Sequence, residues 1–178
     1  GYLFPDTYFV DYDAEPKAVI KQMLMMFESR MVNRFRDDLR VSRRTLQEIV
    51  TLASLVEREV MEPAERPVVA GVYLNRLRRR MRLECDATVQ YALGYWKRRL
   101  RLSDLRTPSA YNTYLRSGLP PGPICNPGLG CLEGAMRPAR HEFLYYVANG
   151  NGGHTFARTY EEHLVNVAAY RRRLRSSG

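Results

Sequence analysis

The sequence lacks any apolar run long enough to cross a membrane. Its longest apolar stretches, such as residues 68–74, are far shorter than the ~20 residues that a spanning helix needs. A recognisable signal peptide is also missing, and the chain opens on Gly1 rather than on Met. We therefore expect a piece of a longer protein, with any anchor or targeting segment upstream of residue 1.

Metal-binding and nucleotide-binding patterns are absent as well. The three cysteines show no C-x-x-C spacing, and the three histidines show no H-E-x-x-H spacing. The sequence contains no Gly-rich phosphate loop and no G-x-S-x-G elbow. We expect neither a metal site nor a cofactor. A disulfide between Cys125 and Cys131 stays open, because geometry decides whether two cysteines can be bridged.

Acidic residues are outnumbered by basic ones. Lys and Arg total 28 against 19 Asp and Glu, which gives a formal net charge of +9 and a pI near 9.7. Such a charge favours an anionic partner, whether nucleic acid, anionic lipid or an acidic glycan-peptide polymer. The content of 45% hydrophobic and 26% charged residues in 178 is typical of a globular chain of about one domain. It excludes a collagen-like fibre and a disordered tail.

The first third of the chain predicts a short strand and two helices. Residues 3–10 are aromatic and β-branched around a Pro-Asp bend, which is typical of a strand. Apolar residues recur at every fourth position from Val19 to Phe35, which predicts a helix over about 13–36. Thr45-x-x-Glu48 is a capping box and predicts a second helix that runs to about Met61.

The rest of the chain predicts further helices and one hairpin. Apolar spacing over 69–77 indicates a third helix, and the Pro-rich and Gly-rich segment 109–130 indicates a long shaped loop. A short helix at about 128–136 follows. Asn149–Gly153 is a hairpin turn between strands at 143–148 and 154–157, and a terminal helix begins at Thr159. We expect one α+β domain over residues 1–178, with small antiparallel β elements.

One carboxylate on the second predicted helix is directed toward the apolar side of that helix. Rotation by about 100° per residue places Glu57 within about 60° of the middle of the apolar arc, and Glu59 about 100° away. A poorly solvated carboxyl group has a raised pKa and acts as a general acid near neutral pH. Glu57 is therefore the candidate acid. The alternative is a half-exposed Glu57 that pairs with Arg58.

Glycoside cleavage usually needs a second carboxylate. Asp86 is the candidate, although the run Asp86-Ala87-Thr88 favours a helix N-cap, where Asp is a preferred residue.

The loop at 109–130 carries the residue types of a sugar-binding surface. Tyr111, Asn112, Thr113 and Tyr114 place rings, an amide and hydroxyl groups side by side, and prolines stiffen residues 119–123. Aromatic rings stack on pyranose faces, and amides bond sugar hydroxyls. A crossing loop whose polar groups satisfy its own backbone explains the same residues, and the sequence leaves both interpretations open.

Motifs that are collinear from residue 3 to about 166 resemble the MltG/YceG family of endolytic murein transglycosylases. The most specific is Gly118-Leu119-Pro120-Pro121-Gly122-Pro123-Ile124 followed by Asn126-Pro127-Gly128. The others are Leu3-Phe4-Pro5-Asp6-Thr7-Tyr8, Leu52-Ala53-Ser54-Leu55-Val56-Glu57-Arg58-Glu59, Val72-Tyr73-Leu74-Asn75-Arg76-Leu77, Asp86-Ala87-Thr88-Val89, Ala110-Tyr111-Asn112-Thr113-Tyr114, Tyr145-Tyr146-Val147-Ala148 and Gly152-Gly153-His154-Thr155-Phe156. Many members of the family have Pro where this chain has Ala87, and small residues where it has Cys125 and Cys131.

The resemblance implies a lytic transglycosylase that uses no metal and no cofactor. Such an enzyme cleaves the MurNAc–GlcNAc β-1,4 bond inside nascent peptidoglycan strands and leaves a 1,6-anhydro-MurNAc end. A single carboxyl group acts first as an acid and then as a base, so no second carboxylate is needed. The family motif Val-Glu-x-Glu places this role on Glu57, with Glu59 as the reserve candidate.

The resemblance also implies the surroundings of the site. We expect five residues to contact the glycan, namely Gln90, Tyr111, Asn112, Thr113 and Asn126. The partners expected are peptidoglycan strands and cell-wall synthases. The family is typically single-pass in the inner membrane, with this domain on the periplasmic side. The anchor and a LysM-like subdomain that precedes this domain are then missing from residues 1–178.

Two other functions compete with this prediction. A non-catalytic peptidoglycan-binding module would keep glycan binding and release no anhydro-sugar ends. A nucleic-acid-binding domain is suggested by Tyr95-Trp96 among basic residues, and its affinity would fall steeply with salt. No named nucleic-acid motif is present, so we expect no nucleic-acid partner.

Overall fold

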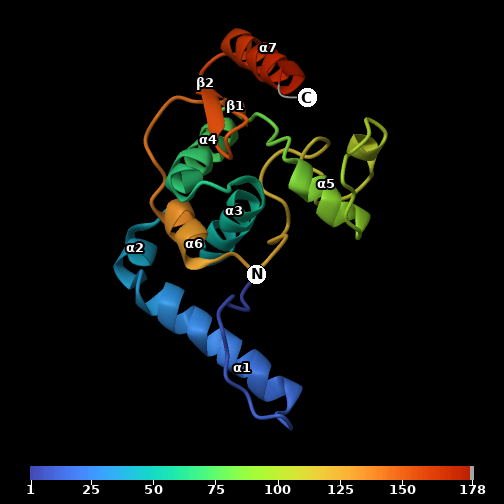
Figure 1. Cartoon of the computed structure of the whole chain (residues 1–178). Helices are drawn as coiled ribbons and strands as arrows, with labels where there is room; N and C mark the ends of the chain where they lie inside the picture. The colour runs from blue at the N-terminus through green and yellow to red at the C-terminus, as the bar shows by residue number, and fades with distance from the viewer. Residues whose placement is uncertain (177–178) are drawn as a thin grey trace.

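Helix α3, residues Leu46–Glu59, lies at the centre of the protein (Figure 1). The computed structural model describes residues 1–176. The predicted capping box starts α3: the Thr45 hydroxyl accepts from the Glu48 amide at 3.2 Å, and the Glu48 carboxylate accepts from the Thr45 amide at 2.7 Å. Every residue from Ile49 to Val56 is buried. The helix therefore has no exposed face between its first and last turns.

Two further helices pack on α3. Helix α4, Arg66–Arg78, is the predicted third helix, and α6, Leu129–Met136, is the predicted short one. Gly134 lets α6 approach α4 closely, since a Cβ there would lie 3.1 Å from the Arg66 backbone. The core combines these three helices, and its largest fully buried side chains include Tyr73, Leu52 and Leu132.

The predicted hairpin is confirmed. Strands β1, Tyr145–Ala148, and β2, His154–Ala157, pair antiparallel, with Tyr146 opposite Phe156. In the turn, Gly150 and Gly152 both adopt φ of +86°, a conformation that glycine reaches without a Cβ clash. Helix α7, Tyr160–Ser176, contacts both strands. Together with seven α-helices among residues 1–176, this sheet gives the predicted α+β fold.

The N-terminal segment differs from its prediction. Residues 3–10 form no strand, because no partner strand adjoins them. The Phe4 amide instead donates to the Met23 carbonyl at 3.4 Å. The predicted helix over 13–36 becomes α1, Pro16–Phe27, and a π-helical segment, η1, Glu28–Asn33. A short helix, α2, Arg36–Val41, follows.

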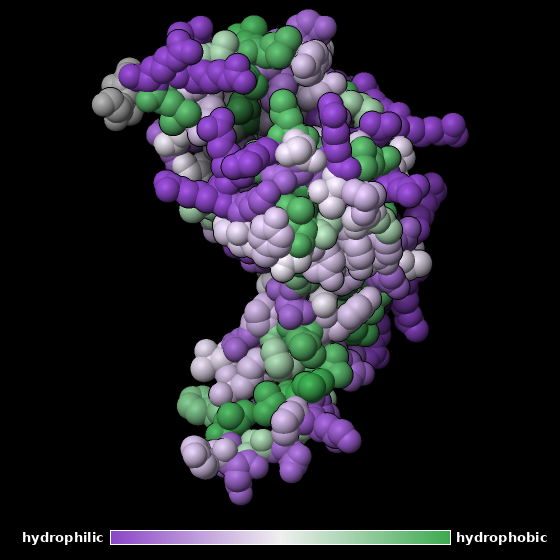
Figure 2. Space-filling view, turned by 90° about the vertical axis from the view of Figure 1, so that its right-hand side faces the viewer, coloured by the Kyte–Doolittle hydropathy of each residue, from purple (hydrophilic) through white to green (hydrophobic). Residues whose placement is uncertain are grey.

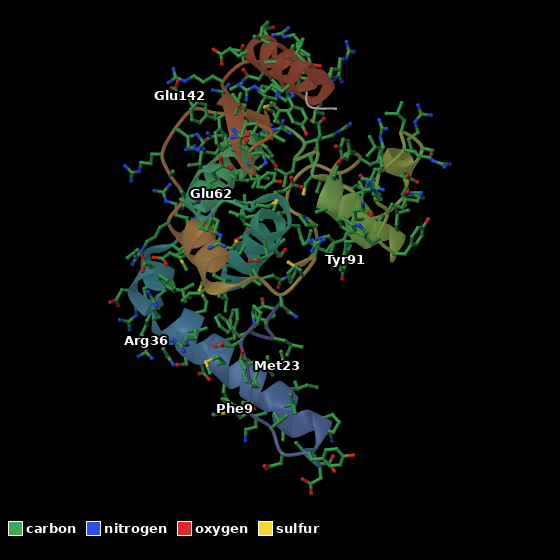
Figure 3. All side chains as sticks on the ribbon, in the orientation of Figure 1. Phe9, Met23, Arg36, Glu62, Tyr91 and Glu142 are labelled. Atoms are coloured by element: carbon green, nitrogen blue, oxygen red, sulfur yellow. The ribbon has the colours of Figure 1, made fainter. Side chains whose placement is uncertain are left out.

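The segment at 3–10 and helix α1 form an N-terminal arm, which extends away from the body in Figure 1. Figure 2 shows hydrophobic side chains on its surface, and Figure 3 labels Phe9 and Met23 there. Only the far end of the predicted apolar face, Phe27, Met31 and Phe35, is buried against the body.

Helix α5, Asp86–Leu93, packs on α3 from the other side. It ends at Gly94, whose φ of +74° is a left-handed C-cap. Two short 3₁₀ turns, η2 at Pro63–Glu65 and η3 at Asp104–Arg106, complete the described elements. Within residues 1–176, no helix is both long enough and apolar enough to cross a membrane.

Replacing Gly71 with Ala is expected to destabilise the protein. A Cβ at residue 71 would lie 2.6 Å from the Ala139 carbonyl and 2.5 Å from His141 Nε2. The overpacking cost, about 1–3 kcal/mol, exceeds the gain of about 1 kcal/mol in helix propensity. A lower midpoint in urea unfolding would show this. An unchanged or higher midpoint would mean that the 139–141 segment moves aside freely.

Candidate active site

A pocket of about 290 Å³ opens where the end of α3, the start of α5 and the hairpin meet. Its lining includes carboxylates and tyrosines from segments far apart in the sequence: Glu59, Arg76, Leu83, Glu84, Asp86, Tyr114, Tyr146 and His163. An open pocket with several converging polar groups is the usual setting of a binding or catalytic site.

Glu59, the last residue of α3, places its carboxylate in this pocket. The thiol of Cys85 donates to its Oε1 at 3.3 Å, and the hydroxyl of Tyr146 donates to its Oε2 at 3.3 Å. Cys85 immediately precedes α5, and Tyr146 lies on β1. The last turn of α3 is therefore covered by two elements that come later in the chain.

Burial raises the pKa of the Glu59 carboxyl above its ordinary value. The hydrogen bonds from Cys85 and Tyr146 oppose this rise, and the negative charge of Asp86 adds to it. The pKa of the Cys85 thiol is itself raised well above its usual value by burial and by Glu59, so Cys85 stays a protonated donor. The site therefore has the properties of a general acid–base centre.

A second layer of contacts fixes Tyr146. Its hydroxyl lies 2.8 Å from the hydroxyl of fully buried Tyr73 on α4. The ring of His154 packs edge-on against Tyr146 with centroids 5.0 Å apart. His154 is in turn held by Glu65, whose carboxylate lies 2.6 Å from Nδ1 and accepts from the His154 amide at 2.8 Å. This explains the His of the Gly-Gly-His motif as a positioning residue for the hairpin.

The predicted burial of Glu57 is wrong. Glu57 is exposed, and its Oε2 accepts from the amide of Gly128, at the start of α6, at 2.9 Å. The rotation argument fails because the middle of α3 is buried on all sides, so the centre of the apolar arc does not show which residue of the last turn is covered. Cys85 and Tyr146 decide that, and they cover Glu59.

The predicted N-cap role of Asp86 is also wrong. Cys85 occupies the N-cap position of α5, with no side-chain cap, and Asp86 is the first helical residue. Its carboxylate accepts from the Tyr114 hydroxyl at 2.6 Å. Burial and the carboxylate of Asp86 raise the pKa of Tyr114, which therefore remains a donor. Asp86 and Tyr114 form one wall of the pocket.

Asn112 and Thr113, predicted to contact glycan, are wholly internal. The amide nitrogen of Asn112 donates to the Leu105 and Thr107 carbonyls at 3.0 and 2.8 Å, and its oxygen accepts from the Tyr114 amide at 2.9 Å. The hydroxyl of Thr113 accepts from the Cys85 amide at 3.0 Å. These side chains place Cys85 and Tyr114 at the pocket, so their part in the site is structural.

The other three predicted contacts lie outside the pocket lining. The side-chain amide of Gln90 is occupied by the Lys97 backbone, at 2.7 and 3.0 Å. Tyr111 packs against the ring of Tyr91, with centroids 4.7 Å apart. Asn126 is exposed, and its oxygen accepts from the Leu3 amide at 3.3 Å. Tyr111 and Asn126 keep surface that a long ligand can reach.

Sequence reasoning missed Tyr146 and Cys85 as parts of the site. Both lie in or beside quoted motifs, but nothing in those motifs marks them as neighbours of Glu59. The three cysteines are free thiols, with Cys85 and Cys131 buried. In the described part of the chain, no group of three His, Cys, Asp or Glu side chains has a metal-binding arrangement.

The comparisons with known proteins agree with this fold. The YceG-like family model matches residues 1–169, so the chain belongs to the YceG-like family. An endolytic murein transglycosylase of Bacillus subtilis strain 168 is 40% identical over 164 residues, which cover 92% of this chain. One of Streptococcus pneumoniae strain D39 is 32% identical over 176 residues, or 96% of this chain.

A solved structure shows the same fold. The crystal structure of a yceG-like protein from Listeria monocytogenes matches with a TM-score of 0.87 and 38% identity, over 93% of this chain and 54% of that one. The chain spans 45% of the length of the Bacillus relative and 32% of the Streptococcus relative.

Proposed function

We propose that this chain is the catalytic part of a lytic transglycosylase that cleaves the MurNAc–GlcNAc β-1,4 bond within peptidoglycan strands. The observation that supports this most directly is the Glu59 carboxyl group, with its pKa raised by burial, in an open polar pocket. The relatives named endolytic murein transglycosylases support the substrate class.

In this proposal Glu59 acts twice. Its carboxylic acid donates a proton to the glycosidic oxygen while the bond from that oxygen to C1 of MurNAc breaks. The C6 hydroxyl oxygen of the same sugar then bonds to C1, and its proton passes to the Glu59 carboxylate. The products are a GlcNAc hydroxyl end and a 1,6-anhydro-MurNAc end. No water is consumed, and the acid is restored.

Asp86 supports a second candidate reaction. It lies in the same pocket as Glu59, and two carboxylates also serve glycoside hydrolysis. The Tyr114 hydroxyl donates to Asp86, which satisfies one of its oxygens and favours a role in holding the pocket wall.

Product analysis separates the two reactions. Purified peptidoglycan is digested with the protein, and the new ends are analysed by mass spectrometry. Anhydro ends, each lighter by one water, are expected. Reducing ends would overturn the transglycosylase and favour the hydrolase. The absence of any new ends would leave the chain a non-catalytic peptidoglycan-binding module.

We further infer that the protein acts outside the cytoplasm, where peptidoglycan is assembled, and in contact with cell-wall synthases. The names of the relatives, which are murein enzymes, support this place of action. Protease accessibility in spheroplasts tests the location, and crosslinking in growing cells tests the synthase contact.

Replacing Tyr146 with Phe is expected to move the alkaline limb of the kcat/KM profile to higher pH. The Tyr146 hydroxyl favours the charged carboxylate, so its loss raises the pKa of Glu59 further. The acid then stays protonated at higher pH. Tyr73→Phe is the control, because that hydroxyl bonds to Tyr146 and its loss should shift the limb less. An unmoved limb in Tyr146→Phe would show that the profile reports another group.

A further inference from the structure

An exposed aromatic pair lies just beyond the C-terminal end of α5. Trp96 is 67% exposed and Tyr95 is 58% exposed. Figure 3 labels Tyr91 on the same helix, which marks this side of the molecule. The guanidinium carbon of Arg58 lies 5.0 Å from the centre of the Trp96 ring, within the range of a cation–π contact. Arg58 and Trp96 thus form a small surface platform.

The loop that carries Trp96 is held by hydrogen bonds on its C-terminal side. Both polar atoms of the Gln90 side chain bond the backbone of Lys97, directly after Trp96. The carboxylate of Asp104 accepts from Lys97 Nζ at 2.6 Å and from the Arg101 amide at 2.8 Å. These bonds hold the backbone directly after Trp96, which lowers the entropy cost of binding a ligand there.

The platform lies along the same helices as the pocket. Arg58 directly precedes Glu59 at the end of α3. Helix α5 begins at Asp86, in the pocket wall, and ends at Leu93, near the platform. Seven residue steps along a helix span roughly 10 Å. A polymer that occupies the pocket and follows α5 would therefore reach Trp96 within a few sugar units.

The positive charge of Arg58 is available to a ligand. Within the described residues it is exposed, and no ion pair joins it to a carboxylate, although Glu57 and Glu62 are close in sequence. Its guanidinium lies over the Trp96 ring, and Trp96 remains 67% exposed. An aromatic face beside a free guanidinium matches a ligand with a flat apolar ring face and a carboxylate.

We propose that Trp96 and Arg58 form a remote binding subsite for a peptidoglycan strand, in which a pyranose ring stacks on Trp96 and Arg58 binds a stem-peptide carboxylate. The subsite rests on the proposed function, since it takes the same polymer. It acts in binding and leaves the acid–base step to Glu59.

An anionic membrane surface is the competing occupant. The adjoining residues Arg98, Arg99 and Leu102 are exposed, and basic residues beside apolar ones also suit lipid headgroups. The strand is favoured because Arg58 lies on α3 next to the candidate acid, whereas a membrane contact needs only the loop.

The test measures binding of soluble peptidoglycan strands to the inactive variant Glu59→Gln, with and without stem peptides on the strands. Adding Trp96→Ala should weaken binding of both ligands about tenfold, and Trp96→Phe should restore most of it. Adding Arg58→Gln should weaken binding about threefold, and only for strands with peptides. Tyr12→Ala, a fully exposed aromatic on the N-terminal arm, is the matched control and should change neither.

Two results would overturn the subsite. One is equal binding by the Trp96→Ala and Tyr12→Ala proteins. The other is a Trp96→Ala protein that loses binding to phosphatidylglycerol vesicles but keeps its binding to strands, which would assign the loop to a membrane. Failure of the proposed function looks different, because the Glu59→Gln parent would then bind no strands or the unmodified protein would release no anhydro ends.

Discussion

Replacing Glu59 with Gln is expected to slow release of 1,6-anhydro ends by about 10²–10⁴-fold, the usual contribution of a general acid–base group. The amide keeps the shape of the side chain, but it neither donates a proton to the leaving oxygen nor accepts one from the C6 hydroxyl. Anhydro ends released from purified peptidoglycan are counted by mass spectrometry under initial-rate conditions.

Glu57→Gln is the matched control for this prediction. The two residues lie two positions apart on α3, but Glu57 is exposed and its carboxylate accepts from the Gly128 amide at the start of α6. Its variant should keep activity within about twofold, because the amide oxygen still accepts that hydrogen bond. The reverse result, an inactive Glu57 variant with an active Glu59 variant, would move the acid to the position first predicted from the sequence.

The Glu59→Gln substitution should also make the protein more stable near neutral pH. Below the ordinary Glu pKa of 4.5, Glu59 is protonated in both the folded and the unfolded chain. As the pH rises, the unfolded chain loses this proton first, because the pKa of Glu59 is raised on folding. The wild type therefore loses stability above pH 4.5, up to the raised pKa, and the Gln variant does not.

Thermal unfolding at several pH values tests this linkage. The Tm of Glu59→Gln should exceed that of the wild type at pH 7, and the difference should shrink toward pH 4.5. A Gln variant that is inactive and also less stable at pH 7 would indicate that damage to the fold accounts for the lost activity. Inactivity with higher stability is the signature of a catalytic group that costs folding energy.

The second large effect is expected for Asn112→Ala, which should destabilise the fold by about 2–3 kcal/mol. The Asn112 side chain is 0% exposed and makes three hydrogen bonds to the backbone. Its loss leaves the Leu105 and Thr107 carbonyls and the Tyr114 amide without these partners. Tyr114, in the pocket wall, would lose its anchor as well.

Urea unfolding measures the change, and Asn126→Ala provides the comparison. Asn126 is exposed and makes a single hydrogen bond to the Leu3 amide at 3.3 Å, so its variant should lose less than about 0.5 kcal/mol. Normal stability in Asn112→Ala, combined with a raised KM, would return Asn112 to the list of glycan contacts.

Elements with strong local signals were predictable from the sequence. The capping box at Thr45 and Glu48 defines the start of α3, and the Gly-rich turn at 149–153 defines the hairpin. In both, the decisive interactions join residues within a few positions of each other. The strand expected at 3–10 was wrong for the converse reason, because a strand needs a partner that local sequence does not supply.

The sequence by itself determined the fold class, the family and a short list of acidic candidates on one helix. Only the tertiary structure showed which of Glu57 and Glu59 is covered, because Cys85 and Tyr146 come from distant segments that fold over one side of the last turn of α3. The roles of the residues in the loop at 111–114 also depended on the tertiary structure. Their residue types suit a sugar, but the side chains of Asn112 and Thr113 are buried, and Tyr114 lines the pocket. The pKa of a carboxyl group and the access of a side chain to ligand both depend on which residues pack over them. Those residues come from distant parts of the chain, so only the tertiary structure brings them together.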